Sequence, residues 1–330
     1  MSILVTGGAG YIGSHTVRML REQGHDVVVL DSMEYGFEAA LLGAELHVGN
    51  IHDRAMVADL CTSHGVTQAV HFAAYKSVGE SMEQPEKYWV NNVEGTVDLV
   101  EGLLAAGVRD IVFSSSCSVN GTPAEIPVTE DAPIAPESVY AESKAMVERI
   151  LHWYAVTRSL RAVSLRYFNA AGASEDAKIG EDWTRSLNLI PLVMKATLGR
   201  APAVKVFGTD YPTPDGTCIR DYIHVDDLAD AHIKALAHLA QQGSAGYDIA
   251  LNVGTGVGSS VLEVINATER ISGRKVPYDV APRRAGDAVA TFADPSRITS
   301  TLGWVPTRSL DDIITSAWQW HSTHLDGYAS

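Results

Sequence analysis

The stretch SVYAESKAM, from Ser138 to Met146, places Tyr140 four residues before Lys144. In a helix, residues i and i+4 lie on one face, so the phenol and the ammonium would share one cavity. A free phenol ionises near pH 10, and a cation within about 4–6 Å favours the phenolate. The pair could therefore act as a base near neutral pH if a second positive charge, such as an oxidised nicotinamide, assisted the lysine. The spacing alone is also compatible with an ordinary helix.

A glycine-rich turn follows the first apolar run. SILVTG leads into GAGYIGSH, with Gly7, Gly10 and Gly13 three residues apart at the start of a predicted helix. Without a Cβ, glycine lets the backbone approach a pyrophosphate, and the helix N-terminus offers free N–H groups to the anion. Tight strand-to-helix turns also use glycine, but the position in the first βα turn favours a dinucleotide site.

The second apolar run, DVVVLD, ends at Asp31. A carboxylate here can accept both ribose hydroxyls of NAD and would repel the 2′-phosphate of NADP, so NAD is the predicted cofactor. A helix cap or turn residue is the alternative for Asp31. Ser116 closes the run DIVFSSS, where it could converge with Tyr140 and Lys144 on the nicotinamide. It would then hydrogen-bond the reacting oxygen while Tyr140 carries the proton, with capping of the next turn as its alternative.

Strand-like runs alternate with helix-length segments, which predicts βαβ units and a parallel sheet covered by helices on both faces. These runs are SILVTG, DVVVLD, ELHVGN, QAVHFAA, DIVFSSS and AVSLRYFN. Apolar spacing predicts a helix near 95–106. After about Phe168 the rhythm gives way to turn-rich stretches, although YDIALNVGTG is predicted to return as a strand. We expect one domain at 1–168, with the chain returning near 225–256, and a second at 169–330.

The bulk composition is that of a globular protein, with 46% hydrophobic and 20% charged residues in 330. A formal charge of −15 argues against nucleic acid or an anionic membrane surface as partner, so positive charge for a phosphorylated ligand must be local. We expect no signal peptide and no membrane span. Three cysteines, Cys61, Cys117 and Cys218, lack metal-ligand spacing, which favours a reduced, cytoplasmic chain with no metal site.

These residues resemble the extended short-chain dehydrogenase/reductase superfamily, and within it the UDP-glucose 4-epimerase family along nearly the whole chain. The longest of the matching segments, VFGTDYPTPDGTCIRDYIHVDDLADAH, contains a stretch specific to that family. The others are VTGGAGYIGSHT, HFAAYKSVGESMEQPEKY, NNVEGT, FSSS, LRYFNAAGA and APRRAGD.

The resemblance implies an α/β fold with a Rossmann-type doubly wound parallel sheet for NAD, a smaller α/β domain for a UDP-sugar, and a homodimer. It implies reversible C4 epimerisation of UDP-glucose and UDP-galactose through a 4-keto intermediate, with N-acetylhexosamines as a further substrate class. A nucleotide-sugar 4,6-dehydratase would carry an acid and a base directly after the serine, where this chain has Cys117 and Ser118. A non-catalytic NAD-binding regulator is the other alternative, and such proteins typically lose the Tyr/Lys pair.

Carried over by position, Lys76 would meet the NAD phosphates with Asn91 nearby, and Tyr167 would border the nicotinamide. The predicted catalytic residues are Ser116, Tyr140 and Lys144, and the last two would also contact the cofactor. The remaining predicted cofactor contacts are Gly7, Gly10, Tyr11, Ile12, Gly13, Asp31, Asn50, Ile51, Phe72 and Ala73. The predicted substrate contacts are Ser116, Asn169, Asn188, Leu189, Arg220, Arg284, Asp287 and Thr291.

Arginine suits this role because its planar fork matches phosphate oxygens, although Arg220 beside Asp221, or Arg284 near Asp287, could instead form surface ion pairs. The chain also departs from the family in three places. Asn120 replaces an aromatic residue, and Asn50 stands where an aspartate usually contacts adenine. The segment SMEYGFEAALLGA after Asp31 is short, so contacts of residues 32–36 do not transfer. The small Thr291 would leave room at the C2 substituent of the sugar.

Overall fold

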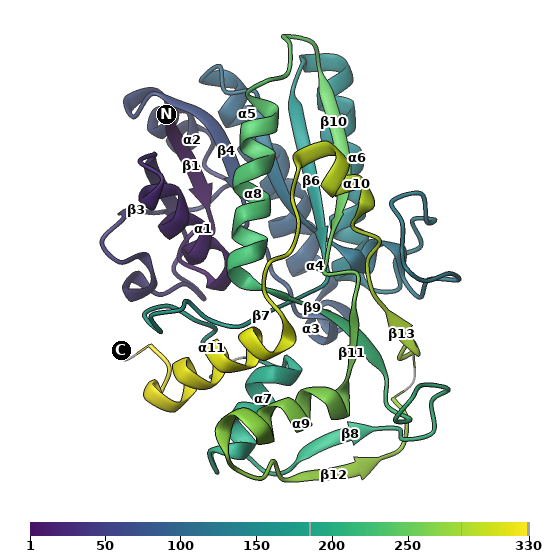
Figure 1. Ribbon diagram of the computed structural model, residues 1–330. Helices are drawn as coiled ribbons and strands as arrows, with labels where there is room; N and C mark the ends of the chain where they lie inside the picture. Colours follow the sequence, from purple (N-terminus) through teal and green to yellow (C-terminus); the bar gives the residue numbers. More distant parts are fainter. Residues whose placement is uncertain (185, 285, 329–330) are drawn as a thin grey trace.

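The computed structural model describes residues 1–184, 186–284 and 286–328, which form a large sheet-based region and a smaller lobe beneath it (Figure 1). The large region is built on seven parallel strands in the order β10-β6-β5-β4-β1-β2-β3. They are β1 (Ser2–Thr6), β2 (Asp26–Asp31), β3 (Glu45–Val48), β4 (Val66–His71), β5 (Asp110–Ser116), β6 (Arg161–Tyr167) and β10 (Tyr247–Val253). The predicted parallel sheet is confirmed, including the returning strand β10, which pairs with β6.

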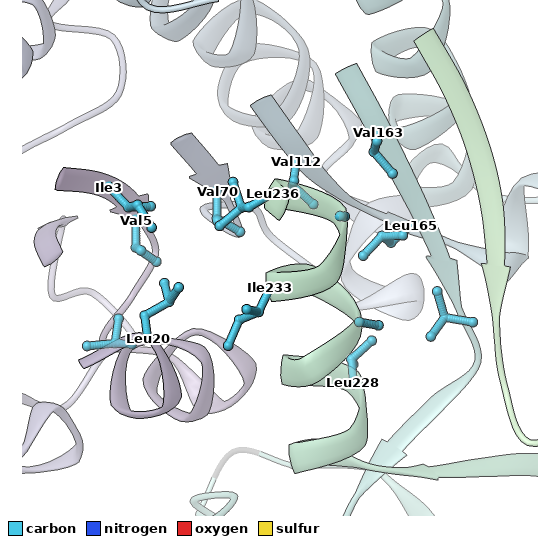
Figure 2. Close-up of a cluster of buried hydrophobic side chains, with 14 of the residues drawn as sticks. Ile3, Val5, Leu20, Val70, Val112, Val163, Leu165, Leu228, Ile233 and Leu236 are labelled. Atoms are coloured by element: carbon cyan, nitrogen blue, oxygen red, sulfur yellow. The ribbon is translucent and has the colours of Figure 1, made fainter. Parts of the chain in front are cut away.

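Helices cover both faces of this sheet. One face carries α1 (Tyr11–Glu22) and α8 (Val225–Leu239), and the other carries α2 (Arg54–Ser63), α5 (Gly95–Ala105) and α6 (Val139–Arg158). Successive side chains of a strand point to opposite faces, so Ile3 packs in one core cluster and Leu4 in the other. Figure 2 shows Ile233 and Leu236 of α8 among strand side chains such as Val112.

Short helices shape the edge of the sheet where its strands end. They are η1 (Glu38–Leu41), α3 (Val78–Glu83), α4 (Pro85–Tyr88), η2 (Trp89–Glu94) and η3 (Cys117–Asn120). The η2 segment is a π-helical turn between α4 and α5, a feature frequent at functional sites.

The smaller lobe contains a short sheet of β9 (Ile219–His224) with β7 (Asn169–Ala171), β11 (Gly258–Ser260) and β13 (Ala290–Thr291). A second pair joins β8 (Val204–Phe207) to β12 (Tyr278–Ala281), and α7 (Leu189–Thr197), α9 (Val261–Ser272) and α11 (Leu310–Thr323) complete the lobe. These helices share a separate apolar core.

The chain passes between the two regions several times. It leaves the large sheet after β6, returns from β9 through α8 to β10, and leaves again. It comes back once more, because α10 (Ser296–Leu302) packs against α8 and β10. The residue limits of the two domains stay a prediction. None of the helices within residues 1–184, 186–284 and 286–328 has the length and apolarity needed to cross a membrane.

Candidate active site

A cavity of about 460 Å³ opens where the parallel strands of the large sheet end. Open α/β sheets commonly bind ligands outside the carboxyl ends of their strands. Every residue predicted to contact the cofactor lines this cavity: Gly7, Gly10, Tyr11, Ile12, Gly13, Asp31, Asn50, Ile51, Phe72, Ala73, Lys76, Asn91, Tyr140, Lys144 and Tyr167. The fold therefore brings together residues from across the first half of the chain.

The glycine turn between β1 and α1 has no room for side chains. Gly7 has φ +71°, and a Cβ there would lie 2.6 Å from the backbone nitrogen of Ala73. A Cβ on Gly13 would lie 2.3 Å from the carbonyl oxygen of Gly7. Gly10 is the N-cap of α1 and contributes no side-chain cap, so the first turn keeps N–H groups for an anion. This cradle fits the pyrophosphate of a dinucleotide.

Asp31 lies buried at the end of β2, beside the glycine turn. Its Oδ2 accepts the N–H of Ala9 at 3.0 Å, and its Oδ1 accepts the N–H of Met33 at 2.9 Å. The turn role considered for this residue is thus present. A carboxylate has about four lone-pair sites, so two remain for hydroxyl groups of a ligand. The same side chain can brace the loop and face the ribose of a nucleotide.

Tyr140 and Lys144 lie on the first turns of α6, which begins after the N-cap Ser138. Both are buried, with exposed fractions of 7% and 3%. The Lys144 Nζ lies 5.9 Å from the centre of the Tyr140 ring and donates to the carbonyl oxygen of Ser114 at 2.8 Å. The predicted i, i+4 pairing on one helix face is confirmed, and β5 fixes the direction of the lysine.

Burial acts on the two groups in opposite directions. Burial raises the pKa of Tyr140 well above its usual value, while a hydrogen bond from Ser116 acts to lower it. Burial lowers the pKa of Lys144 to about 7, and Glu148 opposes that change. The protein groups alone therefore leave Tyr140 a weak acid, because burial of the phenol outweighs the effect of Ser116 on its pKa. This differs from the expectation that Lys144 favours the phenolate, and it agrees with the need for a second cation.

Ser116 combines the two roles considered for it. As the N-cap of η3, its Oγ accepts the N–H of Ser118 at 3.2 Å and lies 2.9 Å from the Ser118 Oγ. Ser116 also acts to lower the pKa of the Tyr140 phenol, so the end of β5 and the start of α6 are coupled at this group. Nearby, Ser114 donates to the hydroxyl of Tyr167 at 3.2 Å. The serines that end β5 thus position both tyrosines.

Lys76 lies at the exposed rim of the cavity, 69% exposed, with its Nζ 3.7 Å from an oxygen of Glu181. The same oxygen accepts from the side-chain nitrogen of Asn188 at 2.8 Å. Asn188 precedes Leu189, the first residue of α7. Glu181 therefore connects a predicted cofactor contact, Lys76, to a predicted substrate contact, Asn188.

None of the predicted substrate contacts is among the described residues that line the cavity. Ser116 lies on β5 of the large sheet, and the contacts not yet described lie in the smaller lobe. Thr291 of β13 pairs in register with Arg220 of β9, and Asn169 of β7 pairs with Tyr222 of the same strand. The Arg220 guanidinium lies 3.5 Å from a carboxylate oxygen of Asp287. The short sheet thus gathers Asn169, Arg220, Asp287 and Thr291 next to β6, which ends at Tyr167.

The predicted alternative of an Arg220–Asp221 surface pair is wrong. Asp221 is fully buried, and its carboxylate accepts backbone N–H groups of Thr255, Gly256 and Ala293. It therefore ties the end of β10 to the residues after β13. Arg284 is exposed, with its guanidinium carbon 4.4 Å from the centre of the Phe207 ring.

The two asparagine departures have local roles. Asn50 lines the cavity, and its side-chain oxygen accepts the N–H of His52 at 3.1 Å. The buried Asn120 donates to the carbonyl oxygens of Ala132 and Pro133 at 3.1 and 3.0 Å. It therefore holds the loop that leads to α6 in place of the aromatic residue.

Sequence reasoning missed several residues of the cavity wall. The short segment after β2 contributes Ser32, Glu34, Tyr35, Gly36 and Phe37 to the cavity wall. The later part of the chain contributes Gly180, Asp182 and Tyr328. Phe37 stacks on Tyr328 with ring centres 4.9 Å apart, and the Tyr328 hydroxyl contacts the backbone of Gly180. No local motif marks such long-range contacts.

Asn92 was also missed. Its side chain accepts from the N–H of Tyr75 and donates to the Ser143 hydroxyl, so it joins the cavity wall to α6. The paired asparagines in NNVEG were the available signal, because a buried amide needs several partners.

Comparison with known proteins places these features in context. The model of the NAD dependent epimerase/dehydratase family matches residues 3–254. UDP-glucose 4-epimerase of Halalkalibacterium halodurans is 44% identical over 331 residues, covering 100% of this chain and 98% of the relative.

Two solved structures are also similar. One is UDP-glucose-4-epimerase from Stenotrophomonas maltophila, solved with bound NAD and formylated UDP-arabinopyranose. Its TM-score is 0.95 and its sequence is 41% identical, and the match covers 98% of this chain and 99% of that chain. UDP-glucose 4-epimerase from Brucella ovis, in complex with NAD, has a TM-score of 0.93 and 42% identity, covering 96% and 97%.

Proposed function

Because the chain belongs to the NAD dependent epimerase/dehydratase family, we propose that it interconverts UDP-glucose and UDP-galactose by inverting C4 of the sugar. One observation carries the proposal: the buried Tyr140 and Lys144 line a cavity whose glycine cradle and Asp31 fit NAD. Ser116, also buried, lies at the end of β5 and acts on the Tyr140 phenol from behind this lining. The full-length similarity to UDP-glucose 4-epimerases supports the same reaction.

The glycine cradle and Asp31 would hold NAD, which would supply a hydride acceptor for C4 and a donor of the same hydride to the opposite face of the 4-keto sugar. Tyr140, as phenolate, accepts the proton of the C4 hydroxyl while the C4–H bond breaks and the C=O bond forms. After the ketone has turned about its pyrophosphate linkage, Tyr140 returns the proton to the same oxygen. Every atom and electron pair is restored, so no external oxidant is consumed.

The neighbours of Tyr140 keep this proton transfer within reach. Ser116 donates to the phenolate and holds the sugar oxygen beside it, in keeping with its action to lower the pKa of Tyr140. Lys144 lies one helical turn after Tyr140 on α6, where it would supply the part of its positive charge that it keeps and would hold ribose hydroxyls of the cofactor. Asp31 holds the other ribose and excludes a 2′-phosphate.

The smaller lobe supplies the contacts to the UDP group. Arg220 and Arg284 meet the phosphates, because their guanidinium groups provide the local positive charge that an acidic chain needs. The remaining contacts to the UDP-sugar come from Asn169, Asn188, Leu189 and Asp287. The pyrophosphate is thereby clamped while the sugar ring is left free to turn.

The test is incubation of the purified chain with UDP-galactose, without added NAD, followed by coupled detection of UDP-glucose. Formation of UDP-glucose until both sugars reach equilibrium is the expected result. A 6-deoxy-4-keto product would point to a dehydratase, and unchanged UDP-galactose with bound NAD would point to a regulator. Either result overturns the proposal.

The sugar range follows from Thr291. A small side chain at this position leaves room for an acetamido group at C2, and Thr291 is partly buried directly beside Arg220. The range therefore extends to UDP-N-acetylglucosamine and UDP-N-acetylgalactosamine. In Thr291→Tyr, turnover of the N-acetyl sugars should be lost while that of UDP-galactose is largely kept. An unmodified enzyme active on UDP-galactose alone would refute this extension.

The assembly is a homodimer formed through α5 and α6, in a cytoplasmic setting. The apolar side chains of Trp153 and Val156 on α6 are 62% and 61% exposed. The Tyr154 hydroxyl donates a hydrogen bond to a carboxylate oxygen of Glu101 on the adjacent α5. Such apolar exposure is characteristic of an interface. The three cysteines are free thiols, which suits a reducing compartment. Sedimentation of the unmodified chain and of Trp153→Glu should separate dimer from monomer, and a monomeric unmodified chain would refute the assembly.

A further inference from the structure

A cluster of two histidines and one glutamate lies on the outer edge of the large sheet, away from the strands that carry Ser116 and Tyr167. Glu45 and His47 belong to β3, the last strand of the sheet, and His64 is the C-cap of α2 (Figure 1). Their potential ligand atoms all lie within 4.8 Å of one another. The predicted absence of a metal site rested on the spacing of the three cysteines alone, and none of them belongs to this cluster.

The geometry converges on one point. The Nε2 atoms of His47 and His64 lie 3.0 and 3.6 Å from the same oxygen of Glu45. Hydrogen bonding explains the first distance but not the second, which exceeds the usual limit of about 3.2 Å for N–H···O bonds. Ligands about 2.0–2.1 Å from a tetrahedral zinc ion lie roughly 3.4 Å apart, a value between the two observed distances. The three side chains therefore need little movement to share one ion.

The local backbone favours this convergence. Glu45 and His47 are two residues apart on a strand, so their side chains leave the same face of the sheet. His64 follows α2, whose C-terminal end carries partial negative charge and attracts a cation. The side chains of His47 and His64 are 28% and 27% exposed, so an ion can reach them from solution.

We propose that Glu45, His47 and His64 form a surface site for a divalent transition metal ion such as Zn²⁺. Two imidazoles and one carboxylate select zinc, copper or nickel over magnesium, which prefers oxygen ligands. Three protein ligands leave one position for water. The ion joins the edge strand β3 to the end of α2, and β3 leads directly to Gly49, Asn50 and Ile51 of the cavity wall.

The test uses the full chain, stripped with a chelator and titrated with ZnCl₂ or MgCl₂ by calorimetry. The unmodified chain should bind one zinc ion at this site and no magnesium there. Zinc binding should weaken by at least about tenfold in each of three single variants, His47→Gln, His64→Gln and Glu45→Gln. The double variant, which combines His47→Gln with His64→Gln, should lose zinc binding at this site. His152→Gln is the matched control, since His152 is paired with a single carboxylate, Asp248, and it should bind zinc normally.

Cobalt substitution gives a second readout. A visible absorption band of bound Co²⁺ should appear in the unmodified chain and the His152→Gln control, and should be absent in the double variant. Equal circular dichroism and equal UDP-galactose turnover of the metal-free chains would show that the variants fold. Unchanged zinc stoichiometry and affinity in the double variant would overturn the proposal and leave a histidine–glutamate ion-pair cluster only.

Discussion

The cofactor side and the sugar side of the candidate site are built differently. The cofactor cavity is walled by strands, tight turns and helices that share the two large cores, and its reactive groups are buried. The sugar-side residues lie on strands of two to six residues, on loops and at the start of α7. Arg284 is exposed, and the Arg220 and Asp287 side chains are about a fifth to a quarter exposed.

This difference suits two ligands with different residence times. A cofactor that is regenerated in each turnover can remain in a rigid, enclosed cradle, whereas a substrate must enter and leave through the more open lobe. Loops and short elements supply such mobility because fewer buried contacts hold them. Changes on the cofactor side should therefore affect chemistry and folding, and changes on the sugar side should affect mainly substrate binding.

The largest expected effect is that of Tyr140→Phe. Removing the hydroxyl removes the proton acceptor, so turnover of UDP-galactose should fall at least about 10²-fold, the low end of general-base contributions. Bound NAD, measured after denaturation, should stay at the level of the unmodified chain. Near-normal turnover would exclude Tyr140 as the base.

Arg220→Gln tests the sugar side. Loss of the charged contact to the phosphates should raise KM for UDP-galactose about 10- to 100-fold, with a smaller change in kcat and no loss of NAD. The control is Arg270→Gln, which alters an exposed pair with Asp311. If NAD content falls along with substrate affinity, the two sides are not independent.

Gly13→Ala tests the rigidity of the cradle. A Cβ at this position meets backbone atoms, so the free energy of unfolding should fall by about 1–3 kcal/mol and NAD should be lost on purification. Gly79→Ala is the matched control, because a Cβ at Gly79 meets no atom within 4 Å and its φ is not positive. Denaturant unfolding of both variants measures the difference, and equal stability would show that the turn can relax.

Lys144→Ala should have the smallest effect, on the pH dependence of kcat. The base is active when deprotonated, so kcat rises with pH through the pKa of Tyr140. Burial lowers the pKa of Lys144 to about 7, so this side chain keeps only part of its charge. Removing it should therefore raise the pKa of Tyr140 only slightly, and the rising limb should move to higher pH by less than about one unit. Profiles from pH 6 to 10, with Lys234→Ala on α8 as control, measure the shift. An unchanged limb would restrict Lys144 to its contact with the Ser114 carbonyl group.

Much of the cofactor side was predictable because its signals are local. Each of these signals depends only on residues close together in the sequence. They are the glycine spacing, the alternation of strands and helices, and the four-residue step from Tyr140 to Lys144. Short-range steric rules and helical periodicity turn such patterns directly into structure. The parallel sheet, its returning strand and the Tyr/Lys face were therefore predicted and are confirmed.

Only the tertiary structure decided how distant segments complete the site. Three contacts join residues far apart in the chain. Phe37 stacks on Tyr328, and Glu181 contacts both Lys76 and Asn188. The buried carboxylate of Asp221 accepts the backbone N–H of Thr255. The pKa of Tyr140 is likewise set by burial, which no spacing rule reveals. Local sequence determines which elements form and which faces they present, whereas packing determines which faces meet and how much charge each buried group keeps.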